Sequence, residues 1–264
     1  MKIKLLCCVA VFALSACTKS STGRNQIMLF SDNELNKMGA QSFDEMKQKQ
    51  KISQHKALNN YVNCVANKIT ANVPKSVHSG AWEVVVFDSE QVNAFALPGG
   101  KIGVYTGILK VAENQHQLGA IIGHEVGHVI EHHSNERMSS NQLAQAGAVA
   151  GDVLLTQSGV QNKELYMMAG MSIVKYGFLM PYSRSHESEA DIVGQNLMAK
   201  SGFLPKAAIS LWQNMAKISQ GSPAEFMSTH PSNTTRIDDL TRNLPKAQQY
   251  YSTSNTPNCA KPKV

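Results

Sequence analysis

The chain has 264 residues, of which 42% are hydrophobic and 17% charged, and its formal net charge is +6 at pH 7. These values are ordinary for a globular protein and allow one domain with a sizeable core, so they exclude a disordered or fibrous chain. Lysine and arginine are scattered without an aromatic stripe between them, so the sequence predicts no nucleic-acid binding. The Walker loop, the dinucleotide fingerprint and the G-x-S-x-G motif are missing from the chain.

The first residues have the pattern of a signal peptide. Lys2 and Lys4 precede an apolar run over residues 5–14, which is too short to cross a bilayer. We therefore expect residues 1–16 to be removed.

The end of this run, Leu14-Ser15-Ala16-Cys17, resembles the lipobox of bacterial lipoproteins. The resemblance implies cleavage before Cys17 and acylation of Cys17, with residues 17–29 as a lipidated tether to the membrane. Thr18 follows the cysteine in place of aspartate. By analogy with lipoprotein sorting, this favours the outer membrane of a Gram-negative cell, with the protein facing the periplasm. A plain secretory signal is the alternative.

Two helices and a small sheet are expected next. Residues 31–34 form a capping box that opens a helix toward Lys51, and an amphipathic pattern over residues 57–73 stops at Pro74. Strands are predicted at residues 82–87, 91–96 and 101–105, with Pro98-Gly99-Gly100 as the turn between the last two. An edge strand beside a catalytic centre could pair with an extended peptide.

The most informative stretch is His124-Glu125-Val126-Gly127-His128, an H-E-x-x-H sequence within a helical pattern over residues 115–133. Two histidines four apart project from one helix face and can hold one zinc ion, while Glu125 can deprotonate the attacking water. Gly123 and Gly127 predict that another element packs closely against this helix. A helix with satisfied histidines is the alternative.

A catalytic zinc needs a third protein ligand. Glu187 and Asp191 share one face of a later helix, which Ser185 could cap, so Glu187 can bind the metal and Asp191 can orient a ligand histidine. Glu189 points away from that face and is the weaker candidate. The alternative is an acidic first turn that complements the helix dipole.

The apolar region between the two motifs, residues 143–179, has two interpretations. It either covers or gates the cleft, or it is a simple helical hairpin of the core. Pro205 begins a further helix that includes Trp212, and a last helix is expected after Thr229-His230-Pro231.

Together these motifs resemble the gluzincin metallopeptidases that include HtpX-like heat-shock proteases and CAAX prenyl endopeptidases. The resemblance covers roughly residues 30–243. It implies an α+β fold: a mostly helical zincin-type domain with a small β-sheet whose edge strand lines the active-site cleft. It also implies one Zn²⁺ per chain, substrate binding at Asn93 and Ala94, and stabilisation of the reaction intermediate by His230, with Arg236 either orienting His230 or sharing the charge. The alternative is that His230-Pro231 only precedes the last helix and that Arg236 is exposed on it. We expect this domain over residues 30–245, followed by a loose tail over residues 246–264.

Two cysteines remain beyond the signal peptide and Cys17. Cys64 and Cys259 could form a disulfide in an oxidising compartment, although nothing in the sequence shows that they lie close together.

The sequence thus predicts a zinc endopeptidase, anchored at the outer membrane, that cleaves periplasmic or misfolded envelope proteins. A non-proteolytic chaperone or assembly factor for outer-membrane proteins, working with the outer-membrane assembly machinery, is the alternative. A latent protease blocked by residues 141–180 is a third possibility.

Overall fold

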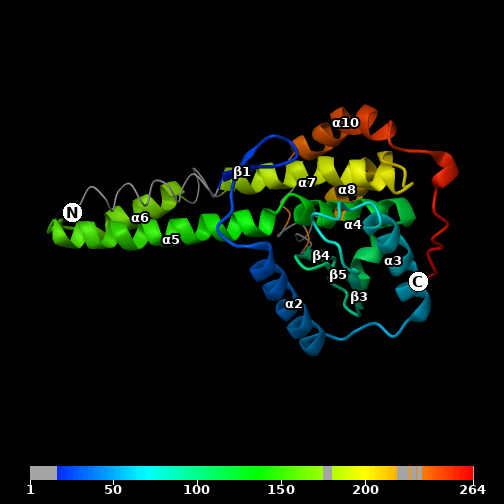
Figure 1. The fold of residues 1–264 in the computed structure, drawn as a ribbon, viewed down its shortest axis with the longest axis horizontal. Helices are drawn as coiled ribbons and strands as arrows, with labels where there is room; N and C mark the ends of the chain where they lie inside the picture. Colours follow the sequence, from blue (N-terminus) through cyan, green and yellow to red (C-terminus); the bar gives the residue numbers. More distant parts are fainter. Residues whose placement is uncertain (1–16, 175–179, 219–225, 227–229, 231–233, 264) are drawn as a thin grey trace. The chain divides into compact units, whose positions relative to one another are not determined.

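A computed structural model describes residues 17–174, 180–218, 226, 230 and 234–263 (Figure 1). The chain divides into two compact units. The hairpin unit contains the chain up to Ser31 together with His132–His186, and the core unit contains Asp32–Glu131 and Glu187–Val264. The predicted signal peptide, Thr229 and Pro231 lie outside the described residues.

A three-stranded sheet of order β3-β5-β4 lies in the core unit. Strand β3 (Glu83–Phe87) runs parallel to β5 (Lys101–Tyr105), and β4 (Ala94–Leu97) runs antiparallel to β5. The predicted hairpin is therefore confirmed. Its turn uses Gly99 at φ 84° and Gly100 at φ 72°, left-handed values that glycine adopts without strain. Strand β4 is an edge strand among the described strands and packs beside α4 (Gln115–Ile130).

The two faces of this sheet enter different parts of the core because side chains alternate along each strand. One face carries Val86 and Val104 into the main core, which it shares with α3 (Lys56–Thr70), α4 and α8 (Lys206–Ile218). The other face carries Phe87 and Tyr105 against Phe43 of α2 (Asp32–Lys49). The core unit is thus layered helix, sheet, helix (Figure 1).

Two predicted helix boundaries are wrong. Helix α4 ends at Ile130 instead of continuing to residue 133, because His132 has a left-handed backbone (φ 54°) that breaks the helix. Helix α7 (Met180–Lys200) begins before Ser185, so Ser185 lies inside the helix and does not cap it. The last helix, α10 (Thr234–Gln248), follows His230 as expected, and the short 3₁₀ helices η1 (Thr106–Lys110) and η3 (Thr253–Asn255) complete this unit.

The hairpin unit contains a small sheet and two helices. Strands β1 (Cys17–Lys19) and β2 (Asn25–Ile27) pair antiparallel, and α5 (His133–Gln157) packs on α6 (Lys163–Val174) (Figure 1). The expected tether is thus an ordered strand pair, because Arg24 and Gln26 donate hydrogen bonds to Glu136 of α5.

The predicted helical hairpin between the motifs is present, but its large apolar side chains are exposed and not part of the core. They are Leu143, Val149, Val153, Leu154, Leu165, Tyr166, Met168 and Met171. Within the described chain, every helix is too short or too polar to span a bilayer. The predicted α+β class, mostly helical with a small sheet, is confirmed.

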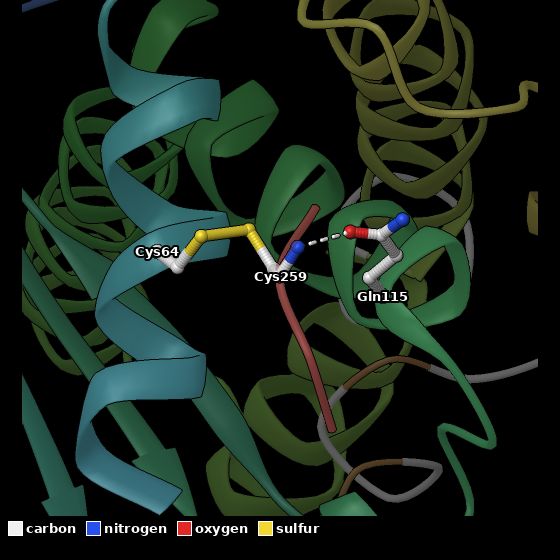
Figure 2. The surroundings of a disulfide bond; sticks show 3 residues. All are labelled: Cys64, Gln115 and Cys259. Carbon is white, nitrogen blue, oxygen red and sulfur yellow. Dashed lines mark hydrogen bonds between the residues drawn. A yellow bond between two sulfur atoms is a disulfide. The ribbon is translucent and has the colours of Figure 1, made fainter. Parts of the chain in front are cut away.

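A disulfide joins Cys64 of α3 to Cys259 with an S–S distance of 2.07 Å (Figure 2). The Cys259 amide donates a hydrogen bond to Gln115 Oε1 at 2.8 Å, and Lys261 Nζ donates to the carbonyls of Leu109 and Ala112. This part of the expected loose tail is therefore fixed to α3 and to the start of α4.

Candidate metal centre

The two motif histidines face one another from consecutive turns of α4. Their Nε2 atoms lie 3.1 Å apart, and their rings are nearly perpendicular, at 87°. His124 is buried and His128 is half-buried. Both lone pairs therefore converge on one point.

Glu187 and His230 bring two further ligand atoms to this point. Glu187 Oε2 lies 3.3 Å from His124 Nε2, and Glu187 Oε1 lies 3.5 Å from His128 Nε2. His230 Nδ1 lies 3.1 Å from Glu187 Oε2 and 3.2 Å from His124 Nε2. A tetrahedral zinc ion with bonds of about 2.0–2.1 Å sets its ligand atoms about 3.3–3.4 Å apart. The observed distances of 3.1–3.5 Å fit that ion.

Close packing of two helices explains how Glu187 reaches the histidines. A Cβ on Gly127 would lie 2.9 Å from the carbonyl oxygen of Ala190, and one on Gly194 would lie 2.7 Å from the backbone of Gly123. Contacts this short leave room only for glycine, so α4 approaches this part of α7 along their backbones. The prediction from Gly123 and Gly127 is thereby confirmed.

Asp191 and Arg236 surround the ligands. Asp191 Oδ1 lies 2.9 Å from His124 Nδ1, the ring nitrogen that faces away from the metal position. Arg236 donates to both oxygens of Asp191 at 2.6 and 2.7 Å, and its Nη1 lies 3.2 Å from Glu187 Oε2. Burial opposes the charge on Asp191, but the Arg236 guanidinium outweighs it and lowers the pKa of the carboxyl. The pair therefore fixes the His124 tautomer.

Burial also acts on the other acidic and basic groups of the centre. It opposes the ionised form of Glu187, yet hydrogen bonds from His124 and His230 lower the pKa of that carboxyl well below its usual range. Hydrogen bonds to Asp191 and Glu187 outweigh burial and raise the pKa of His124 to about 9. The protein surroundings thus favour an anionic Glu187, the form that binds a cation.

Glu125 lies beside the ligands but is not one of them. Its Oε1 is buried and accepts no hydrogen bond from the described residues, and it lies 3.4 Å from His230 Nε2. Burial raises the pKa of this carboxyl. An unsatisfied carboxylate oxygen at this position suits a general base for an attacking water.

The predicted substrate-binding residues lie at the start of the edge strand. The carbonyl of Asn93 accepts a hydrogen bond from the Tyr105 amide at 3.1 Å, and Ala94 is buried. The carbonyl of Val92 accepts from the Phe226 amide at 3.0 Å. These contacts place the strand in the core unit beside α4, and its role in substrate binding stays a prediction.

The sequence did not predict that Trp212 and Phe226 lie beside the candidate metal centre. The Trp212 ring lies 5.9 Å from the His124 ring, and Phe226 stacks on His230 at 4.6 Å. Trp212 follows the helical spacing of core residues in α8, which gave no sign of its position beside the metal centre.

A second group of histidines lies in the hairpin unit. Potential ligand atoms of His133, Glu136 and His186 lie within 4.8 Å of one another. The rings of His133 and His186, however, are stacked 4.2 Å apart at 15°. Because a histidine lone pair lies in the plane of its ring, stacked rings cannot both point at one ion. Glu136 instead binds Arg24, Gln26 and His186.

The chain matches one protein family and is similar to several known proteins. The sequence model of peptidase family M48 matches residues 53–244. The mitochondrial metalloendopeptidase OMA1 of Schizosaccharomyces pombe is 36% identical over 176 residues, 66% of this chain and 50% of that protein. The human mitochondrial metalloendopeptidase OMA1 is 33% identical over 190 residues, 69% of this chain and 36% of that protein. The beta-barrel assembly-enhancing protease of Yersinia pestis is 29% identical over 208 residues, 75% of this chain and 41% of that protein.

These matches confirm one prediction and correct another. The expected class is confirmed as far as the family, a peptidase family whose matching relatives are named metalloendopeptidases. The predicted location at the outer membrane, facing the periplasm, is contradicted, because the relatives at 33–36% identity include proteins named as mitochondrial. The narrower resemblance to HtpX-like and CAAX prenyl endopeptidases and the acylation of Cys17 stay predictions. The chain spans about half the length of the curated relatives that it matches.

Proposed function

Because this chain belongs to peptidase family M48, we propose that it is a zinc-dependent endopeptidase whose metal is held by His124, His128 and Glu187. The observation that carries the proposal is the convergence of their ligand atoms at distances of 3.1–3.5 Å, beside a buried Glu125 oxygen that accepts no hydrogen bond from the described residues. When bound, zinc would polarise the scissile carbonyl and lower the pKa of water at the site.

Glu125 is the proton carrier in this proposal. Its carboxylate takes the proton of the attacking water and then delivers it to the leaving amine. Its raised pKa, caused by burial, makes the carboxylate a stronger base for the water proton than an exposed glutamate would be, and it keeps that proton on Glu125 until the leaving amine accepts it.

His230 occupies the fourth corner of the ligand set in this structure. Catalytic zinc keeps one position for water, whereas four protein ligands close a site. We infer that the present arrangement is a closed state and that His230 withdraws before the attacking water enters. We propose that the withdrawn ring stabilises negative charge on the substrate.

We further propose that the substrates are unfolded or misfolded proteins, bound as extended chains. Strand β4, an edge strand among the described strands, would hold a peptide through main-chain hydrogen bonds, with little demand on the peptide sequence.

A chaperone or assembly factor that does not cleave its clients is the second candidate. The Yersinia pestis relative is named as a beta-barrel assembly-enhancing protease, which supports an assembly role. The complete H-E-x-x-H sequence opposes a purely binding function, because binding does not require Glu125.

The deciding experiment compares Glu125→Gln with Glu164→Gln, a matched change at an exposed position of α6. We expect Glu125→Gln to retain zinc by metal analysis and to lose casein cleavage by at least about 100-fold, since it removes the general base. Glu164→Gln should behave as the wild type. Full cleavage by Glu125→Gln, or a wild type without zinc, would overturn the proposal.

A further inference from the structure

Trp212 lies under the buried arginine of the metal centre. The guanidinium carbon of Arg236 is 3.6 Å from the centre of the indole ring, and both side chains are almost fully buried. We propose that Trp212 is a positioning residue of this centre: its ring face fixes the guanidinium plane of Arg236, and Arg236 in turn places Asp191 and Glu187. This inference rests on the proposed zinc function.

The orientation of Arg236 matters because its guanidinium N–H groups bind several partners that lie in different directions. Two of its nitrogens bind the two oxygens of Asp191, Nη1 lies 3.2 Å from Glu187 Oε2, and Nη1 donates to the His230 carbonyl at 3.3 Å. A guanidinium is planar and presents its donors as a rigid fork. A tilt of that plane would therefore break several of these contacts together.

The charge of the centre shows why Arg236 cannot be absent. Glu125, Glu187 and Asp191 are buried carboxylates, and Arg236 is the cation that touches two of them. Without the guanidinium the same pocket would hold an excess negative charge, which burial makes costly.

An indole suits the position beneath Arg236 better than an aliphatic side chain does. The negative face of the ring attracts a guanidinium and accepts its flat surface, and this cation–π contact strengthens away from water. The edges of Trp212 also contact the site, with its ring 5.9 Å from the His124 ring and 5.8 Å from the Phe226 ring. Trp212 thus connects α8 to residues on α4 and α10.

The test compares Trp212→Leu with Trp212→Phe, which keeps an aromatic face, and with Leu211→Ala as a packing control. Leu211 is the preceding residue of α8 and is equally buried, but it belongs only to the core. We measure the zinc dissociation constant by competition with a chelator, the absorption spectrum of the cobalt-substituted protein, and the midpoint of heat unfolding.

Trp212→Leu should weaken zinc binding by about 10–100-fold, as loss of support behind metal ligands does, and alter the cobalt spectrum. Trp212→Phe should restore affinity to within about threefold of the wild type. Leu211→Ala should lower the unfolding midpoint and leave affinity and spectrum unchanged. Equal zinc affinity of wild type and Trp212→Leu, or equal loss in Leu211→Ala, would overturn the inference.

Arg236→Lys provides a second measurement if Trp212→Leu does not fold. It keeps the charge and loses the planar fork, so it should weaken zinc binding to a similar degree. A folded Arg236→Lys protein with wild-type affinity would also overturn the inference. A wild type that fails to bind zinc would instead overturn the proposed function.

Discussion

At the scale of single residues, the sequence allowed us to name the proposed metal ligands but not all the residues that surround them. The i, i+4 spacing places His124 and His128 on one helix face whatever the rest of the fold does. The position of Glu187 was predicted by chemistry, because a third ligand was required. The approach of Trp212 to Arg236 depends on how α8 packs, and no local pattern encodes that packing.

Glu136 offers a residue-scale test by pH. Burial alone would raise the pKa of this carboxyl, but hydrogen bonds from His186 and Arg24 outweigh it and lower the pKa to about 2. Since the folded pKa lies below the unfolded value of about 4.5, the charged group stabilises the fold above that pH, and the stabilisation disappears as pH falls toward 2.

We therefore expect Glu136→Gln to unfold at a lower temperature than the wild type at pH 7, with the difference shrinking between about pH 5 and pH 2. Circular dichroism at a series of pH values measures the difference in unfolding temperature between the variant and the wild type. Glu90→Gln, which removes an exposed ion pair with Lys110, is the control and should change little. A difference that stays constant with pH would contradict this assignment.

At the scale of elements, periodicity predicted the motif helix, the hairpin and the helix after Pro205 more reliably than their ends. The end of α4 was missed because a single left-handed residue, His132, decides it. The beginning of α7 was missed because a serine inside a helix and a serine that caps one look alike in sequence.

The close contact between α4 and α7 gives an element-scale prediction. Gly194→Ala would place a Cβ 2.7 Å from the Gly123 backbone, so the helices must separate. We expect destabilisation of about 1–3 kcal/mol and weaker zinc binding, because Glu187 moves with α7. Urea unfolding and chelator competition measure the two effects.

Gly147→Ala is the matched control within α5. Within the described part of the chain no atom lies within 4 Å of the added Cβ, so alanine should stabilise the helix by about 0.5–1 kcal/mol and leave zinc binding unchanged. Equal zinc affinity in both variants would show that the glycine contact does not position the ligand.

At the scale of the whole molecule, the α+β class followed from the order of helical and strand patterns. The division into two units could not be predicted from these patterns. Both units are discontinuous in sequence, and each is completed by residues far along the chain. The pairing of Cys64 with Cys259 could be named but not shown from sequence, since it spans 195 positions.

The disulfide gives a prediction at this scale. Cys64→Ser should lower the unfolding free energy by about 2–4 kcal/mol, because the bridge restricts the unfolded chain. Cys259→Ser and the double variant should lower it by the same amount, since each removes the same bond. Urea unfolding without reductant measures the change, and reductant should affect only the wild type. Additive losses from the two serine changes would contradict a shared bridge.

The bond from Cys259 to Gln115 has a consequence for biosynthesis. Gln115 opens the helix that carries both motif histidines, and its partner Cys259 is made 144 positions later. Arg236, too, is translated long after the histidines that it supports. During translation, the H-E-x-x-H motif is therefore made well before Arg236 and Cys259, which contact its helix or its histidines. The growing polypeptide therefore lacks the complete arrangement until Cys259 has been added.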